Sequence, residues 1–240
     1  MLQEDKAAIL PSSIPFVDGV VVPFALEAAV CALSVNEPGP CMPGVLTPAL
    51  GLPYPSLQDV PSTGKTLVVY GGSSSAGSMT IQLATAAGIR VIALAGAANL
   101  EFVKTCGAVA AFDYKDAHVV EKVVQAIGTT DFVGIFDAIS LPETFELDLA
   151  VLTKMGGGWL ACTHPPPKEN VPENVKTGMI FAVNDIAAPV WRNYVTEALE
   201  KGKLKCLPPP TVIGKGLKFV NEGLKKSKEG VSATKLVVEL

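Results

Sequence analysis

The sequence predicts an α/β fold, namely a doubly wound parallel sheet of the Rossmann type. The main observation is that short apolar segments with strand character alternate with helical segments from residue 65 onward. The first of these strands, 66–70, leads directly into a turn made of glycine and serine. Hydrophobic residues make up 49% of the 240 residues and charged residues 18%, which is enough for one large buried core. Strands and helices that alternate in this way are typical of βαβ units.

The elements divide the chain into three predicted segments. Residues 1–64 are expected to form an N-terminal helix over 14–34 and then a linker rich in proline and glycine. Pro23 would be tolerated in the first turn of that helix and would kink it further in. Residues 65–204 are expected to form the Rossmann domain, and residues 205–240 a C-terminal helix and strand.

Within the Rossmann domain, the apolar runs and the glycines that end them fix the expected elements. Strands are predicted at 66–70, 90–95, 110–114, 132–137 and 157–163, with 179–183 as a candidate sixth strand. Helices are predicted at 76–87, 99–106, 116–127 and 143–154. Further helices are expected at 190–201 and 215–228, and a last strand at 235–239.

Composition and charge exclude several classes of protein. The net charge of −4 argues against a nucleic-acid partner, since binding to phosphates needs clustered lysine and arginine. The longest apolar run, 20–33, is interrupted by Pro23 and Glu27, so no membrane span is expected. The acidic start is unlike a signal peptide, and a cytoplasmic protein is predicted. The five cysteines show no metal-binding spacing and are expected to be free thiols, with no bound metal.

The turn after the first strand is the most informative motif. Gly71 and Gly77 bracket it, and Ser73, Ser74, Ser75 and Ala76 lie between them. Glycine allows a backbone to approach a pyrophosphate closely, and the N-terminus of the following helix supplies partial positive charge. The strict GxGxxG fingerprint is absent, and an ordinary βα turn remains an alternative. Its place between an apolar strand and a helix favours a dinucleotide site.

The end of the second strand bears on the choice of cofactor. An acidic residue there would bind the 2′-hydroxyl of the adenosine ribose and favour NAD(H). Residues 95–99, which include Gly96 and Asn99, contain no aspartate or glutamate. Lys104 and Tyr114 are expected to fold back toward a 2′-phosphate. NADP(H) is therefore expected in preference to NAD(H), and a chain that binds neither remains an alternative.

The sequence resembles the medium-chain dehydrogenase/reductase superfamily, and in particular its zinc-free, quinone-reductase-like branch with the fungal trans-acting enoyl reductases. The resemblance covers nearly the whole chain. It is carried by AILP (8–11), VPFAL (22–26), GLP (51–53), the run 68–87, CGA (106–108), FDY (112–114), GKL (202–204), PPP (208–210), GKGL (214–217) and KLVVEL (235–240). Members of this family begin with a GroES-like domain before the point where this sequence starts. The resemblance therefore implies a naturally shortened member or a fragment, whose two ends are remnants of the companion domain.

The resemblance also shows two departures from the family. The helix near Leu26 usually carries a Ser-Thr pair whose threonine contacts the nicotinamide, and here Glu27 and Ala28 stand in those positions. The ribose-side loop often has a histidine before its asparagine, and here Ala98 precedes Asn99.

Candidate catalytic residues lie where the strands end. In this fold, ligands bind at the carboxyl ends of the strands, where Asp137, Thr163 and His164 are expected, with Glu27 facing them. His164 is a candidate acid/base, with a plain loop histidine as the alternative. Cys162 is a candidate partner for it or a buried core thiol. Asp137 is a candidate catalytic group or a strand-end cap, and Thr163 a candidate cofactor contact.

Three functions remain open from the sequence. The first is an NAD(P)H-dependent reductase of an unsaturated carbonyl or a polyketide-like substrate in secondary metabolism. The second is a non-redox enzyme, such as an isomerase, cyclase or decarboxylase, that uses an open apolar cleft. The third is a non-catalytic partner protein. Expected partners are a small apolar substrate and either a second copy of the chain or a synthase.

Overall fold

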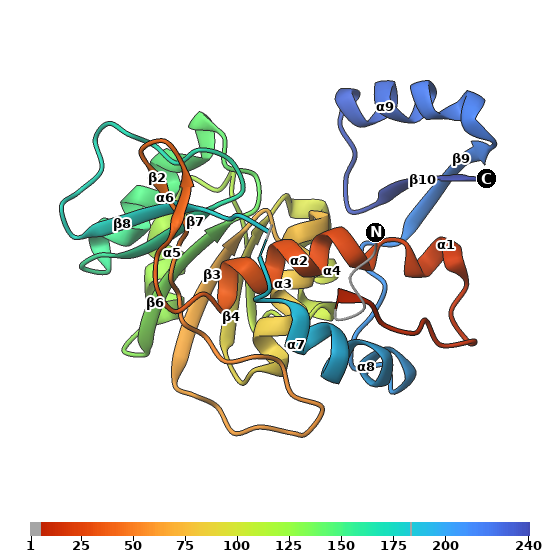
Figure 1. The fold of residues 1–240 in the computed structure, drawn as a ribbon. Helices are drawn as coiled ribbons and strands as arrows, with labels where there is room; N and C mark the ends of the chain where they lie inside the picture. Colours follow the sequence, from red (N-terminus) through yellow and green to blue (C-terminus); the bar gives the residue numbers. More distant parts are fainter. Residues whose placement is uncertain (1–5, 183) are drawn as a thin grey trace.

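The fold is built on one sheet of six parallel strands. The computed structural model describes residues 6–182 and 184–240. The strand order is β5–β4–β3–β6–β7–β8, and Figure 1 labels β4, β3, β6, β7 and β8 of this sheet. The strands are β3 (Lys65–Tyr70), β4 (Arg90–Ala95), β5 (Ala110–Asp113), β6 (Asp131–Asp137), β7 (Gly158–Cys162) and β8 (Val175–Met179). This is the predicted doubly wound Rossmann sheet, and the prediction of the fold class is confirmed.

Helices cover both faces of the sheet. Alternate residues of a strand point to opposite faces, so each face has its own hydrophobic core. Leu67 and Val69 of β3 pack into one core, which is completed by α2 (Val22–Leu33), α3 (Ser75–Ala86) and α8 (Thr196–Glu200). Val68 and Tyr70 of the same strand pack into the other core. That second core is completed by α5 (Val119–Ile127) and α6 (Pro142–Lys154).

The N-terminal helix differs from its prediction. The expected helix over 14–34 is divided into α1 (Phe16–Gly19) and α2, and Pro23 lies in the first turn of α2, where proline is tolerated. The stretch Phe16–Leu33 has 18 residues and a mean hydropathy of 1.9, so by length and composition alone it could cross a membrane. This stretch is longer than the apolar run 20–33 that the sequence analysis identified. However, 56% of it is buried inside the fold, as in a core helix.

The sixth strand was predicted at the wrong place. It was expected at 179–183, and β8 instead occupies Val175–Met179 and pairs with β7. Gly178 allows this pairing next to the linker, since a Cβ atom there would lie 2.5 Å from the backbone nitrogen of Pro48. Ile180 and Ala182, whose apolar character suggested a strand, line a cavity at the end of the sheet instead. Residue 183 lies outside the described part of the chain.

Short elements complete the fold. The linker contains the hairpin of β1 (Pro40–Met42) and β2 (Val45–Leu46), which was not predicted. The ribose-side loop and the helix after it are η2 (Ala97–Asn99) and α4 (Leu100–Thr105). The predicted helix over 190–201 consists of α7 (Ala188–Val190), a π-helical turn η3 (Trp191–Val195) and α8.

The C-terminal segment forms a separate arm (Figure 1). It consists of β9 (Pro210–Lys215), η4 (Leu217–Phe219), α9 (Val220–Glu229) and β10 (Lys235–Glu239). β9 and β10 pair in parallel with each other and not with the main sheet. We did not predict β9 from the sequence, because this strand begins within the run Pro208–Pro210. Proline is nevertheless acceptable at the first residue of a strand.

Candidate functional site

Two cavities lie at the carboxyl ends of the strands, where ligands bind in open α/β sheets. The first cavity has a volume of about 790 Å³ and the second about 550 Å³. The first cavity is lined by the serine turn, the loop after β4, Tyr114 and residues 231–234 of the C-terminal arm. The second cavity is lined by Lys6, Pro23, Phe24, Glu27, Ala28, Thr163, Ile180, Ala182 and Trp191. Most of the predicted cofactor-binding residues line the first cavity, and Glu27 and Thr163 line the second. The other predicted site residues, Ala76, Gly77, Lys104, Asp137 and His164, line neither cavity.

The turn after β3 has the tight geometry that a phosphate site needs. Gly71 has a φ of +70°, which favours glycine. Ser74 caps α3, and its Oγ accepts a hydrogen bond of 3.0 Å from the backbone N–H of Gly77. A Cβ atom on Gly77 would lie 2.2 Å from the carbonyl oxygen of Gly71, so only glycine fits there. Ala76 lies between them in the first turn of α3, where the backbone N–H groups are available to an anion.

A lysine from the far end of the chain reaches this turn. The Nζ of Lys235, the first residue of β10, donates to Ser75 Oγ over 3.2 Å. It also lies 5.7 Å from the ring centroid of Phe24. Partial burial lowers the pKa of Lys235, and no described carboxylate forms a salt bridge with it. Sequence reasoning missed this residue, and the one available signal was a single cation opening an apolar strand.

The ribose side of the first cavity is tied to the C-terminal arm. Asn99 Nδ2 donates to Ser232 Oγ at 2.8 Å and to Ser73 Oγ at 3.4 Å. Tyr114 packs against Tyr70 with ring centroids 5.7 Å apart, and Gly96 lies beside its ring. Asn99, Ser73, Tyr114 and Gly96 thus gather around one cavity, in agreement with their predicted places.

Lys104 does not join this group, and that expectation is wrong. Lys104 is absent from the lining of the first cavity, and its Nζ pairs with Glu101 at 2.8 Å on α4. Helix α4 is short, and the side chain at 104 pairs one turn back along it. Lys115, next to Tyr114, is the lysine that lines the cavity on this side. The lining also includes one carboxylate among the described residues, that of Glu143.

Asp137 is a cap and not a catalytic group. Its side chain is fully buried. Its Oδ1 accepts hydrogen bonds of 2.8 Å from the backbone N–H groups of Ile139 and Ser140, and its Oδ2 accepts one from the Thr144 hydroxyl. These contacts hold the turn from β6 to α6, and the side chain is closed to solvent, so a substrate does not reach it. The expectation of a catalytic Asp137 is therefore wrong.

The Cys162–His164 pair is also excluded. Cys162 is fully buried, and burial followed by the nearby charge of Asp137 raises the pKa of its thiol, so the thiolate is disfavoured. His164 is exposed and lines neither cavity. Its Nδ1 lies 3.3 Å from Thr163 Oγ1. His164 therefore contacts neither of these two cavities, whereas Thr163 lies in the lining of the second one.

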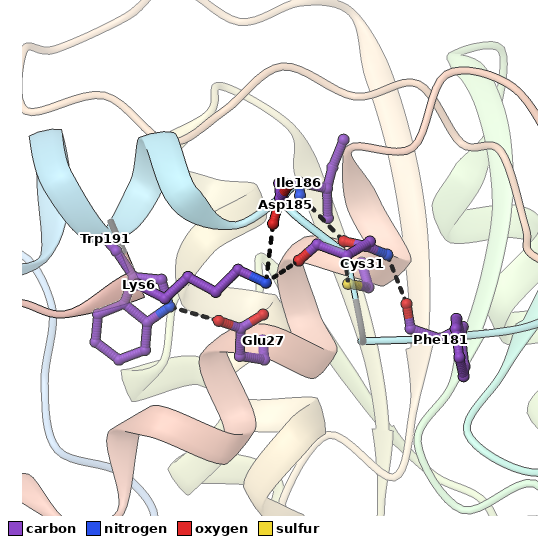
Figure 2. A network of polar contacts seen from close by, with 8 residues as sticks. Lys6, Glu27, Cys31, Phe181, Asp185, Ile186 and Trp191 are labelled. Atoms are coloured by element: carbon purple, nitrogen blue, oxygen red, sulfur yellow. Dashed lines mark hydrogen bonds and ion pairs between the residues drawn. The ribbon is translucent and has the colours of Figure 1, made fainter. Parts of the chain in front are cut away.

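Glu27 faces the second cavity, as predicted. Figure 2 shows its contact with Trp191, whose indole N–H donates to Glu27 Oε1 over 2.6 Å. The other oxygen, Oε2, is buried and has no hydrogen-bond partner among the described residues. Lys6 is engaged elsewhere, since its Nζ pairs with Asp185 at 3.2 Å and donates to the carbonyl oxygen of Asn184. Glu27 therefore lines the second cavity with one oxygen held by Trp191 and the other closed to solvent.

Comparisons with known proteins agree with this architecture. Residues 76–184 match the family described as zinc-binding dehydrogenase. The chain is 66% identical to "Dehydrogenase orsE" of Emericella nidulans, over 98% of the chain and 68% of that protein. It is 34% identical to "Trans-enoyl reductase himH" of Aspergillus japonicus, over 100% of the chain and 67% of that protein. The chain thus spans about two thirds of the length of these relatives.

The fold is shared with solved structures of low sequence identity. A quinone oxidoreductase of Pseudomonas syringae pv. Tomato DC3000 superposes with a TM-score of 0.70 at 14% identity, over 100% of the chain and 69% of that structure. The family description mentions zinc, but no group of three histidine, cysteine, aspartate or glutamate side chains among the described residues could hold a metal ion. The residues seen here do not fit a zinc site.

The two relatives together settle the family. Both match the chain from end to end, and both are oxidoreductases by name. The sheet order and the turn after β3 agree with that assignment. The chain therefore belongs to the medium-chain dehydrogenase/reductase superfamily, among the fungal dehydrogenases and trans-enoyl reductases.

Proposed function

We propose that the chain is the cofactor-binding part of an NADP(H)-dependent reductase that acts on an unsaturated carbonyl or polyketide-like compound. The observation that carries the proposal is the contact of Lys235 with the serine turn. A partly buried lysine that forms no salt bridge among the described residues lies against Ser75, beside the N-terminus of α3. Such a cluster of a cation, hydroxyls and backbone N–H groups is complementary to a phosphate anion.

The chain's residues fit a dinucleotide that runs between the two cavities. Tyr114, Asn99 and Lys115 would hold the adenosine ribose in the first cavity. Gly71, the three serines and Lys235 would hold the pyrophosphate. Glu27 and Thr163 line the second cavity, which would take the nicotinamide side. When bound, the nicotinamide supplies a hydride, while the protein supplies position and excludes water.

Two observations support NADP(H) in preference to NAD(H). No acidic residue follows β4 within 95–99, so a 2′-phosphate would meet no carboxylate in that loop. Lys115 lines the first cavity beside Tyr114, which it approaches to 5.8 Å from the ring centroid. A lysine in this place would attract the 2′-phosphate.

The substrate class rests on the relatives and on the apolar surroundings of the second cavity. The relative from Aspergillus japonicus is named a trans-enoyl reductase. An apolar groove of about 330 Å³ shares Pro23 and Trp191 with the second cavity. Its walls include Leu10, Phe16 and Val195. An apolar carbon chain would find a continuous apolar surface there.

Titration of the protein with NADPH and with NADH, followed by nicotinamide fluorescence, tests the proposal. We expect saturable binding and tighter binding of NADPH. The Lys235→Met variant should weaken NADPH binding by about tenfold or more, since a hydrogen bond to a charged group contributes about 1.5–3 kcal/mol. Lys228→Met, at an exposed position of α9, is the matched control and should bind normally. Absence of saturable binding, or equal affinities of the two variants, would refute the proposal.

A further inference from the structure

A second buried carboxyl group lies next to the turn that joins β6 to α6. Asp148 is fully buried on α6, and neither of its oxygens has a nitrogen or hydroxyl partner among the described residues. It stands four residues after Thr144, so both side chains lie on the same face of the helix. The Thr144 hydroxyl donates to Asp137. The Asp148 carboxyl also faces Asp137, and a side-chain hydrogen bond joins the two acids.

The turn after Asp137 contributes to both cavities at the strand ends. Ile139 and Thr144 line the first cavity. Ile139 also packs against Gly71 of the serine turn, where a Cβ atom would lie 2.6 Å from Ile139 Cγ1. Ser140 Oγ accepts a hydrogen bond of 2.8 Å from the backbone N–H of Thr163, which lines the second cavity. A change at the carboxyl pair therefore reaches the surfaces that would hold a dinucleotide.

The same turn has a conformation that depends on Asp137. Ser140 has a φ of +54°, in the left-handed region that serine rarely adopts. Its backbone N–H donates to Asp137 Oδ1 over 2.8 Å, and its hydroxyl donates to the Asp137 carbonyl oxygen over 2.7 Å. Such a conformation persists where surrounding contacts enforce it. Any displacement of the Asp137 carboxylate would therefore release the turn.

The two acids have no cation as a partner, since none of the salt bridges among the described residues includes either of them. The titratable groups that face Asp148 from the sheet are Asp137 of β6, Tyr70 of β3 and Cys162 of β7. The charged side chains of α5 and β8 are engaged elsewhere, namely Glu121 with Lys154, Lys122 with Asp116, and Lys176 over the ring of Trp159. Two ionised carboxylates in this place would repel each other without compensation.

We infer that Asp148 is a positioning residue for the dinucleotide site, which acts through Asp137 and only as the protonated acid. Its O–H donates to the Asp137 carboxylate, which in turn holds the turn. When rising pH removes that proton, the two charges repel each other, the turn loosens, and an added negative charge lies near an anionic ligand. Dinucleotide affinity therefore falls as pH rises. The inference rests on the proposed function, because it concerns how tightly the dinucleotide binds.

The test measures the dissociation constant of NADPH by nicotinamide fluorescence from pH 6 to pH 9.5, in the wild type and in Asp148→Asn. The asparagine amide keeps a donor for Asp137 and does not titrate. The wild type should lose affinity relative to Asp148→Asn by about threefold or more over this range, since one proton changes an equilibrium by up to about tenfold per pH unit. Titration of the ligand and of Lys235 is common to both proteins and cancels in the ratio of their dissociation constants.

Two further variants separate positioning from charge and from core packing. Glu143→Gln removes an exposed carboxylate that lines the first cavity from the same helix, and its ratio to the wild type should stay constant with pH. Asp148→Leu fills the core but offers Asp137 no donor, so at pH 6 it should bind NADPH about tenfold or more weakly than Asp148→Asn. Asp148→Asn decides the question by itself if Asp148→Leu does not fold.

The outcomes distinguish this inference from the proposed function. If the ratio of wild type to Asp148→Asn changes by less than about threefold over the pH range, the inference is overturned while the proposed function stands. A similar change in Glu143→Gln also overturns it, because a long-range effect of charge would then explain the result. If the wild type does not bind NADPH at any pH, the proposed function itself fails, and the inference with it.

Discussion

Asp148 offers the sharpest test of the energetics of this fold. It lies on α6, is fully buried, and neither of its oxygens has a nitrogen or hydroxyl partner among the described residues. Burial raises its pKa well above the ordinary value, and the charge of Asp137 and a side-chain hydrogen bond with Asp137 raise it further. Folded Asp148 therefore keeps its proton to a higher pH than an ordinary aspartate does and shares it with Asp137. We expect Asp148→Asn to fold, because its amide N–H can replace that donor.

The magnitude follows from the raised pKa. In the unfolded chain an aspartate loses its proton near pH 3.9, whereas folded Asp148 holds it to a higher pH. Between those two pKa values the folded state binds more protons, so the free energy of unfolding falls as pH rises. The slope is about 1.4 kcal/mol per pH unit for one group. The stability is greatest below the unfolded pKa and is lost as pH rises toward the folded pKa. Asparagine does not titrate, and this loss should disappear in Asp148→Asn.

Urea unfolding of the wild type and of Asp148→Asn at pH 5, 6, 7 and 8 measures the effect. The variant should gain stability over the wild type by about 1.4 kcal/mol for each pH unit, until the pH passes the folded pKa. Asp116→Asn is the control: hydrogen bonds from Lys122 and His118 lower the pKa of this partly exposed carboxylate, so its difference from the wild type should not grow above pH 5. Parallel curves for the wild type and Asp148→Asn would refute the reasoning.

Three further outcomes are expected from the same structure. Gly77→Ala should destabilise the fold by several kcal/mol and abolish NADPH binding, because its Cβ would lie 2.2 Å from the carbonyl oxygen of Gly71. Urea unfolding measures the stability and fluorescence titration the binding. A variant that behaves like the wild type would contradict the geometry. Cys162 should resist iodoacetamide in the native protein at pH 8, as read by peptide mass spectrometry, because burial raises the pKa of its thiol; rapid alkylation would disprove this. Trp191→Phe should lower the free energy of unfolding by about 1–3 kcal/mol, because Glu27 Oε1 loses its donor; an unchanged urea midpoint would argue against that hydrogen bond.

The sequence alone predicted the sheet because its strands are short, apolar and separated by regular helices. The strand over 90–95 was predicted at its observed bounds, and the turn at Gly71 and Gly77 was recognised from its place between a strand and a helix. These features depend on neighbours in the chain. The sixth strand failed because its position depends on the distant linker, against which Gly178 packs. An apolar run such as 180–182 can line a cavity as well as join a sheet.

The parts of the site that the sequence did not predict come from contacts between distant residues. Lys235 reaches Ser75 across 160 residues, and Trp191 reaches Glu27 across 164. Local periodicity carries no information on such pairs. The choice of Lys104 failed for the same reason, because the side chain that reaches the cavity depends on how the loop after β5 folds. Lys115, one residue beyond Tyr114, lines the cavity instead.

These distant contacts bear on the division of the chain into three segments. A chain limited to residues 65–204 would keep the sheet, the serine turn and Trp191. It would lose Lys235, the cation at the turn, and it would also lose Glu27, which lines the second cavity. Phe24, under the Lys235 ammonium group, would be lost as well. Residues 231–234 line the first cavity, and Glu27 lines the second. The candidate site is therefore formed by all three segments together, although the central segment supplies most of the lining.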